Sequence, residues 1–218
     1  MKLAILGGTG IEGKGLALRF AACGAEVILG SRSAERAGTL ASEYNIFLGK
    51  SLIEGCSNLE ALALAEIVFL AVPFENVLAA IESCRKGFRA GQVLVDVTVP
   101  VAFRGGRPEF VQPEGGSNSQ LIARHVPPGV AVVAAFKTIP AHLLADLPTE
   151  LQCDVFVCSD STEARHRVME IATMIPTLRP LDAGPLEVAA ALERMTFMAI
   201  HLNRRYKRKG ARFTVQGI

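Results

Sequence analysis

The segment GGTGIEG at residues 7–13 constrains the fold of this chain more than any other stretch of its sequence. It follows the apolar run KLAIL, precedes a segment with helical spacing, and contains the pattern G-x-G-x-x-G at Gly8, Gly10 and Gly13. In a strand–loop–helix unit, the first glycine permits the tight turn and the second lets a pyrophosphate approach the backbone. The third lets the helix and the strand pack closely. The sequence therefore predicts a dinucleotide-binding loop, the alternative being a tight turn in an α/β protein that binds no nucleotide.

Apolar, strand-like segments alternate with helix-length segments along most of the chain. The predicted strands are 2–6, 26–30, 66–73, 92–100, 129–136 and 153–158, and the predicted helices are 12–23, 34–44, 75–85, 117–126 and 161–174. Continuous apolar strands need cover on both faces, and an alternating order places helices there. The pattern predicts an α/β fold with a doubly wound, mainly parallel Rossmann-type sheet and a C-terminal helical extension.

The last third of the chain changes character. Residues 176–186 are rich in proline and predict an edge strand with a turn, and residues 187–206 predict one long helix. The apolar stripe of that helix must cover either the sheet domain or a partner subunit. We therefore expect a Rossmann domain over residues 1–150, a smaller α/β and helical part over residues 151–218, and a homodimer. The Gly/Pro-rich segment 103–119 is predicted to be a mobile loop near a site.

Composition and charge exclude several classes of protein. The net charge is only +2, and the basic segment 204–212 has no interleaved aromatic residue except Tyr206, so nucleic-acid binding is not expected. No apolar run has the length of a membrane span, and MKLAIL is too short for a signal peptide. The five cysteines form no CxxC pair and fit reduced thiols. We expect a cytoplasmic protein, whose basic segment is a solvated helix end or a dock for an acidic ligand or a partner subunit.

The tip of the second predicted strand indicates which dinucleotide binds. An Asp or Glu usually binds the ribose hydroxyls of NAD about 20 residues after the glycine loop, but Gly30 is followed here by Ser31 and Arg32, and Arg36 lies four residues further on. An acid would repel the 2′-phosphate of NADP, whereas a hydroxyl and two guanidinium groups would bind it. The sequence predicts NADP(H), the alternative being that both arginines are solvated residues at a helix start.

Other catalytic patterns are not found. The four histidines share no zinc-ligand spacing, so no metal site is predicted, and neither a G-x-S-x-G elbow nor a catalytic cysteine context is present. Asp96, within a predicted strand, is interpreted as a structural carboxylate, and Asp182 as a turn or cap residue. Glu12 is interpreted as a first-turn helix acid that points outward.

Several motifs together resemble those of the NADPH-dependent reductases of the 8-hydroxy-5-deazaflavin coenzyme, the coenzyme F420:NADP oxidoreductases. The resemblance covers nearly the whole chain. The motifs are GGTGIEGKGLALR (7–19), GSR (30–32), FLAVP (69–73), TIPA (138–141), RPLDAGPL (179–186) and NRRYK (203–207). Many dehydrogenases share the first motif in outline, whereas its combination with TIPA and RPLDAGPL is much more specific.

The resemblance implies an enzyme that transfers a hydride between NADP(H) and coenzyme F420. NADP is implied to lie over the loop Gly8–Gly13, including Thr9 and Ile11, and against Ala71, Val72 and Pro73. The deazaflavin ring is implied to stack on the nicotinamide in a second pocket, which residues 151–218 complete together with the dimer contact. That pocket is placed near Val99, Pro100, Lys137, Thr138, Ile139, Pro140, Ala141, Gly184, Leu186 and Thr196. The sequence departs from the family at Lys137, where Asn or His is frequent.

Hydride transfer between these two cofactors needs no acid–base residue from the protein. We therefore expect no catalytic acid or base, and a mechanism in which the protein holds donor and acceptor carbons close, aligned and dry. Two alternatives stay open at this point. An NADPH-dependent reductase of another small substrate, such as an imine or a ketone, would need a catalytic residue over the nicotinamide, and Lys137 is the only candidate. A non-catalytic NADPH-binding sensor would keep the second pocket closed.

Overall fold

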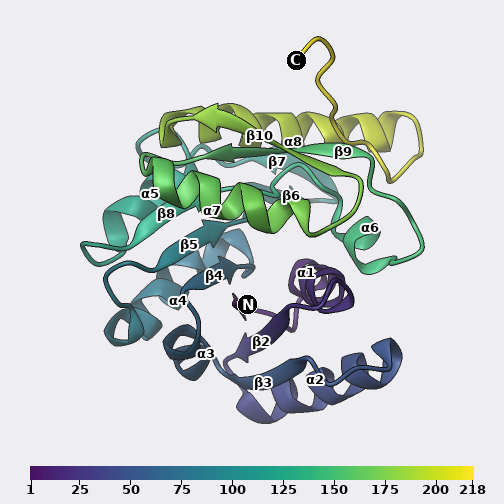
Figure 1. Cartoon of the computed structure of the whole chain (residues 1–218). Helices are drawn as coiled ribbons and strands as arrows, with labels where there is room; N and C mark the ends of the chain where they lie inside the picture. The colour runs from purple at the N-terminus through teal and green to yellow at the C-terminus, as the bar shows by residue number, and fades with distance from the viewer.

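Six neighbouring parallel strands make up most of the eight-stranded sheet in the computed structural model, which describes residues 1–218. They are β1 (Lys2–Leu6), β2 (Glu26–Ser31), β3 (Ile53–Ser57), β4 (Ile67–Leu70), β5 (Val93–Asp96) and β8 (Ala131–Ala134). The full order is β10-β9-β8-β5-β4-β1-β2-β3, so the chain winds first to one side of β1 and then to the other (Figure 1). The predicted doubly wound, mainly parallel sheet is confirmed, and its topological switch point lies between β1 and β4.

The last two strands extend the same sheet beyond β8 and run antiparallel to the other six. β9 (Cys153–Cys158) pairs with β8 in an antiparallel manner at Ala134 and Cys158, and β10 (Leu178–Gly184) lies parallel to β9 at the sheet edge. The predicted edge strand is thus present. The boundary expected at residue 150 falls within one continuous sheet, to which residues 151–218 contribute two strands.

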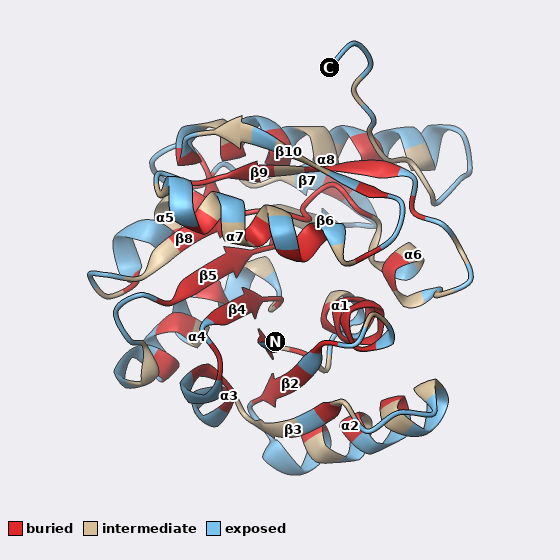
Figure 2. Cartoon of the chain, viewed as in Figure 1, coloured by how far each residue is buried: buried red, intermediate tan, exposed pale blue.

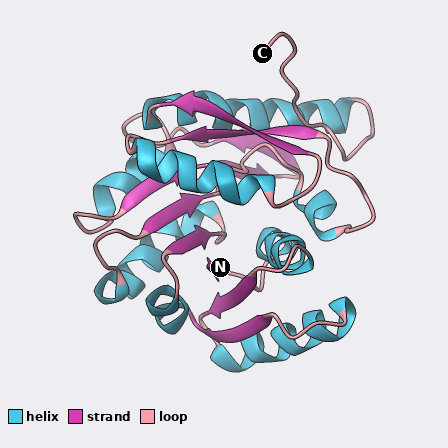
Figure 3. Ribbon diagram, in the orientation of Figure 1, coloured by secondary structure: helices cyan, strands magenta, loops and turns pink.

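Helices cover both faces of the sheet (Figure 3). The helices are α1 (Ile11–Ala22), α2 (Ala34–Leu48), α3 (Asn58–Leu64), α4 (Val77–Cys84), α5 (Asn118–His125), α6 (Ala141–Ala145), α7 (Thr162–Thr173) and α8 (Ala189–Arg205). Alternate residues of each strand enter opposite cores, as Leu3 and Ile5 do against α1, α2, α6 and α7. Ala4 and Leu6 enter the core under α3, α4, α5 and α8. The inner strands β1, β2, β4, β5, β8 and β9 are buried almost throughout, as apolar runs without alternation require, whereas the edge strands β3 and β10 are buried only in part (Figure 2).

Three parts of the fold differ from the sequence-based expectation. The pair β3–α3 was not predicted, because IEGCS has too few apolar residues to read as a strand. The short helix α6 was also missed. The segment 103–119, expected to be a mobile loop, instead contains the turn and the second strand of a hairpin. The two strands of that hairpin are β6 (Val101–Arg104) and β7 (Arg107–Phe110). Its turn residues Gly105 and Gly106 both have positive φ (53° and 73°), which a tight two-residue hairpin turn requires.

Arg19 fixes α6 against α1. Its guanidinium donates hydrogen bonds of 2.6–3.2 Å to the backbone carbonyls of Leu143, Leu144, Asp146, Leu147 and Thr149. Gly15 permits the close approach, since a Cβ there would lie 2.5 Å from Cβ of Leu144. The TIPA segment that leads into α6 is therefore held rigidly beside α1.

None of the helices combines the length and apolar character that a bilayer crossing requires. All five cysteines are free thiols, as expected from their spacing.

Candidate functional site

Two adjoining cavities lie outside the carboxyl ends of the parallel strands. The first, here called the glycine-loop cavity, has a volume of about 520 Å³ and is lined by Gly7, Thr9, Gly10, Ser31, Arg32, Ser33, Arg36, Asn58, Ala71, Val72, Pro73, Asn76, Ala79, Ala80 and Ser83. The second, the hairpin cavity, has a volume of about 490 Å³ and shares Ala71, Val72 and Pro73 with the first. Ligands of open α/β sheets bind in such a crevice, beside the switch point.

The glycine loop has the geometry of a phosphate cradle. A Cβ on Gly13 would lie 2.6 Å from Cα of Gly8, so the third glycine lets helix and strand pack closely. A Cβ on Gly10 would meet no atom nearer than 3.5 Å, which leaves the loop open to a ligand. α1 begins at Ile11 with Gly10 as an N-cap that carries no side-chain cap, so its first backbone N–H groups are available to an anion. The amide of Gly7 donates to Oδ1 of Asn58 at 3.4 Å, a contact that sequence reasoning missed.

The tip of β2 presents two unpaired cations to the same cavity. Arg32 and Arg36 are exposed, and neither guanidinium donates a hydrogen bond or forms an ion pair within the chain. The hydroxyl of Ser33 caps α2 by accepting the amide of Arg36 at 3.2 Å, and the hydroxyl of Ser31 accepts the amide of Ser33 at 3.3 Å. Two free guanidinium groups and a hydroxyl at one cavity wall suit a dianion.

The hairpin cavity has mainly apolar walls. They come from the ends of β4 and β5, from β6, from the TIPA segment and from one face of α8, and they include Val97, Val99, Val101, Phe103, Ile139, Pro140, Ala141, Thr196 and Ile200. The hydroxyl of Thr196 donates to the carbonyl of Lys137 at 2.9 Å or to that of Leu192 at 3.1 Å, and so ties α8 to the cavity floor. Walls of this kind with few polar groups suit a flat aromatic ring.

A buried cluster of charges lies beneath this cavity. The ammonium of Lys137 lies 2.7 Å from Oδ2 of Asp96 and 3.3 Å from Oε1 of Glu193, and all three side chains are fully buried. It also donates to the carbonyl of Thr98 at 2.5 Å. The backbone before it is strained, since Phe136 has φ of 58°. The ammonium thus has three acceptors for its three hydrogens and none left for a ligand.

The two carboxylates are held by further hydrogen bonds. Asp96 accepts the amide and hydroxyl of Thr98 at 2.9 and 2.6 Å and the hydroxyl of Ser119 at 2.7 Å. Asp96 is thus buried and hydrogen-bonded at the end of β5, which fits the structural role inferred for it. Glu193 accepts the amide of Asn118 at 3.0 Å. Burial raises the pKa of Glu193, and the charge of Lys137 opposes that rise.

Glu12 corrects one sequence-based interpretation. Its side chain does not point outward but lines the hairpin cavity together with Lys137 and Pro140. Its Oε1 atom is buried and has no hydrogen-bond partner, and burial raises the pKa of this carboxyl to about 8. The physical reason is that helical side chains lean toward the helix N-terminus, which carries the second residue of α1 back over the loop.

Most of the predicted site residues lie in these two cavities, but several do not. Gly8 and Gly13 serve packing, and Ile11 and Pro100 are absent from both cavity linings. Gly184 and its neighbour Leu186 are also outside. Gly184 ends the edge strand β10, two strands from β8. The motif RPLDAGPL therefore contributes no residue to either cavity lining, and its place beside the deazaflavin ring stays a prediction.

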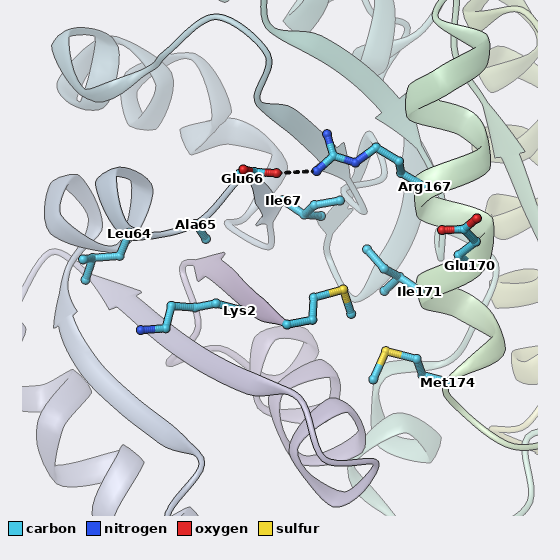
Figure 4. Close-up of a pocket in the computed structure, with 10 residues that line it drawn as sticks. Lys2, Leu64, Ala65, Glu66, Ile67, Arg167, Glu170, Ile171 and Met174 are labelled. Atoms are coloured by element: carbon cyan, nitrogen blue, oxygen red, sulfur yellow. Dashed lines mark hydrogen bonds and ion pairs between the residues drawn. The ribbon is translucent and has the colours of Figure 1, made fainter.

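A third cavity of about 590 Å³ lies at the opposite end of the strands (Figure 4). It is bounded by Lys2 and Ile67 at the amino ends of β1 and β4 and by α7, and an ion pair of 2.7 Å between Glu66 and Arg167 crosses its rim. It has no glycine loop and lies away from the carboxyl ends of the parallel strands, so the pair of adjoining cavities is the candidate functional site.

The chain matches known proteins along its whole length. Residues 2–100 match the family described as NADP oxidoreductase, coenzyme F420-dependent. The chain is 38% identical to an F420-dependent NADP reductase of Methanothermobacter thermautotrophicus, over 98% of this chain and 95% of the relative. It is 35% identical to one from Methanocaldococcus jannaschii, over 96% of each. The crystal structure of a putative F420-dependent NADP reductase from Arthrobacter sp. FB24 superposes with a TM-score of 0.85 at 25% identity, covering 100% of both chains.

Proposed function

The chain belongs to the coenzyme F420-dependent NADP oxidoreductases, and on this premise we propose that the glycine-loop cavity binds NADP(H) and the hairpin cavity binds the deazaflavin ring. The activity of the chain is hydride transfer between these two cofactors. This assignment depends on the continuity of the two cavities. The glycine-loop cavity contains the free cations of Arg32 and Arg36, the hairpin cavity has the apolar walls, and Ala71–Pro73 lines both.

The residues of the glycine-loop cavity fit NADP(H) group by group. The open face of Gly10 and the amino end of α1 would hold the pyrophosphate, with Thr9 beside it. Ser31, Arg32 and Arg36 would bind the 2′-phosphate, since they supply two positive charges and no acid. The nicotinamide end would then reach the shared segment Ala71–Pro73 and enter the hairpin cavity.

The residues of the hairpin cavity would hold the deazaflavin ring against the nicotinamide. Val99, Ile139, Pro140, Ala141 and Thr196 supply apolar walls and one hydroxyl. Bound together, the two cofactors supply the hydride donor and acceptor carbons. The contribution of the protein is to orient the rings and exclude water. Residues 1–150 would bind the dinucleotide, and residues 151–218 would complete the second cavity through α8.

The imine- or ketone-reductase alternative loses its only candidate residue. The ammonium of Lys137 is fully buried and its hydrogens are taken by Asp96, Glu193 and Thr98, so it offers no proton to a substrate. The sensor alternative required a closed second pocket, whereas the hairpin cavity is open beside the first.

We also propose a homodimer and a cytoplasmic location. Met198, Leu202 and Phe103 leave large apolar side chains exposed on α8 and β6, where a second copy could cover them. The size distribution in solution, measured by light scattering with Met198→Lys as the variant, tests the assembly. Five free thiols fit a reducing compartment.

Replacing Arg32 with Ala tests the assignment of NADP. The variant is expected to lose about tenfold or more in affinity for NADPH, because a hydrogen-bonded charge pair to the 2′-phosphate is lost. The use of NADH should hardly change. Bleaching of the visible absorption of oxidised coenzyme F420, with each donor in turn, measures both. Equal losses with NADPH and NADH would mean that Arg32 is structural.

The basic segment at the end of α8 predicts a salt-dependent effect. Arg204 follows Ile200 by one helical turn, at the end of the cavity-lining face of α8, and donates to the carbonyl of Gly106 at 2.6 Å. Coenzyme F420 carries a phosphate and a glutamate chain, which cations here would attract. Neutralising Arg204, Arg205 and Lys207 together should raise KM for coenzyme F420 and flatten its dependence on salt. An unchanged salt dependence would mean that this segment is only a solvated helix end.

A further inference from the structure

Glu12 is the one ionisable side chain of the hairpin cavity that has a buried polar atom without a partner. The carboxyl of Glu12 forms no ion pair, and its Oε1 atom is buried without a hydrogen bond. The residue stands two positions after the N-cap Gly10, so it lies between the glycine loop and the cavity that the loop adjoins. A carboxyl in this position borders the space through which a ring would pass from one cavity into the other.

No fixed cation balances this carboxyl. Lys137 lines the same cavity, but its charge is matched by Asp96 and Glu193. Lys14, on the same helix, lies over the ring of Tyr44 at 5.6 Å from its centroid.

The remaining ionisable groups near Glu12 are also unpaired with it. They are Glu75, exposed on the cavity wall, and His142, exposed on α6, which packs against α1. The guanidinium of Arg19 is turned into the carbonyls that follow α6. No cation of the chain therefore pairs with Glu12, which leaves a bound ligand to supply the positive charge.

The oxidised and reduced states of NADP differ in the charge of the nicotinamide ring. The oxidised ring is cationic and the reduced ring is neutral, whereas the phosphates are the same in both. We propose that Glu12 makes the nicotinamide subsite sensitive to redox state, by pairing as a carboxylate with the cationic ring of NADP⁺ and facing the neutral ring of NADPH as the uncharged acid. The inference rests on the proposed function, since it takes the nicotinamide to lie where the cavities join.

The proposal fixes the sign of a proton linkage. With its pKa raised to about 8 in the free protein, Glu12 is protonated at pH 7, so binding of NADP⁺ must release its proton and grows tighter as the pH rises toward 8. Binding of NADPH keeps the proton and weakens only above that pH. The ratio of the dissociation constants, NADP⁺ over NADPH, should fall by about a hundredfold from pH 6.5 to 8.5, because the two binding reactions differ by one proton. Titration of the 2′-phosphate is common to both ligands and cancels in this ratio.

Calorimetry tests the proposal without any turnover. Binding of each cofactor at pH 7 in two buffers of different ionisation enthalpy gives the number of protons released. We expect the native protein to release about one proton more with NADP⁺ than with NADPH, and Glu12→Gln to show no difference and a ratio that no longer depends on pH. Glu163→Gln removes the same charge from the same first-turn position of α7, away from both cavities, and should behave like the native protein.

Equal proton release with the two cofactors in the native protein would overturn the proposal, and this result does not depend on the folding of any variant. A linkage that persists in Glu12→Gln would overturn it as well. If the native protein binds neither cofactor, or if Arg32→Ala binds NADPH as well as the native protein does, the proposed placement of NADP(H) has failed instead.

Discussion

Replacing Lys137 with Met is expected to lower the free energy of unfolding by about 3–5 kcal/mol, the cost of leaving a buried carboxylate without its cation. Met nearly matches the volume of Lys, so the loss would come from charge and not from a void. In the native protein one ammonium stands between Asp96 and Glu193, at 2.7 and 3.3 Å, in a fully buried cluster. Without it, two carboxyls would face each other in a region from which water is excluded.

The loss from Lys137→Met should depend on pH in a defined direction. Burial already raises the pKa of Glu193 above its ordinary value of 4.5, and the charge of Lys137 opposes this rise, so its removal raises that pKa further. A carboxyl whose folded-state pKa is raised stabilises the fold below its unfolded pKa and loses this stability as the pH rises toward the folded value. The deficit of the variant should therefore be smallest near pH 4 and larger at pH 7.

Denaturant unfolding of three variants measures the effect of Lys137. Lys86→Met removes a Lys from the exposed surface and should change the free energy of unfolding by less than about 0.5 kcal/mol. Adding Glu193→Gln to Lys137→Met should recover part of the loss, because one of the two unpaired carboxylates is gone. If Lys137→Met unfolds like the native protein at pH 7, water must reach this cluster and its ion pairs are not buried in solution.

The glycine loop and the tip of β2 could be predicted because local sequence decides both. The spacing of Gly8, Gly10 and Gly13 requires a strand before it and a helix after it, and the structure has β1 and α1 there. Ser31 and Arg32 follow β2 directly, so their position at the carboxyl edge of the sheet follows from the strand itself. In these places the period of the strand and the start of the helix fix where a side chain points.

The rest of the site depends on contacts between distant parts of the chain. Lys137 was read as a pocket residue because TIPA follows it, whereas its partners Asp96 and Glu193 come from β5 and α8. Gly184 was placed by a sequence motif, which carries no information about the position of β10 at the sheet edge. Glu12 was the exception, since the lean of helical side chains toward the N-terminus would have placed it over the loop.

Enlarging Ala141 to Leu should lower the rate of hydride transfer by about a hundredfold, which is about 2.7 kcal/mol of barrier. Ala141 is the first residue of α6 and lines the hairpin cavity but not the glycine-loop cavity. The longer side chain would enter the space assigned to the deazaflavin ring. A displacement of about 1 Å between donor and acceptor carbons is enough for a loss of this size. The dissociation constant of NADPH should change little, because the residues proposed to bind its phosphates line the other cavity.

Single-turnover transfer from NADPH that carries deuterium at the transferred position isolates this step from cofactor release. We expect Ala141→Leu to keep a full isotope effect while the rate falls, since the bond that breaks is the same and only its alignment has changed. His142→Leu adds an apolar side chain one residue further on, at an exposed position outside both cavities, and should transfer hydride at the native rate. Both variants place a leucine on α6, one in the hairpin cavity and one outside it. A difference between their transfer rates therefore measures the effect of alignment. Equal rates in Ala141→Leu and the native protein would place the deazaflavin ring outside the hairpin cavity. α6, which Arg19 holds against α1 through five carbonyls, would then be a structural support and not a wall of the site.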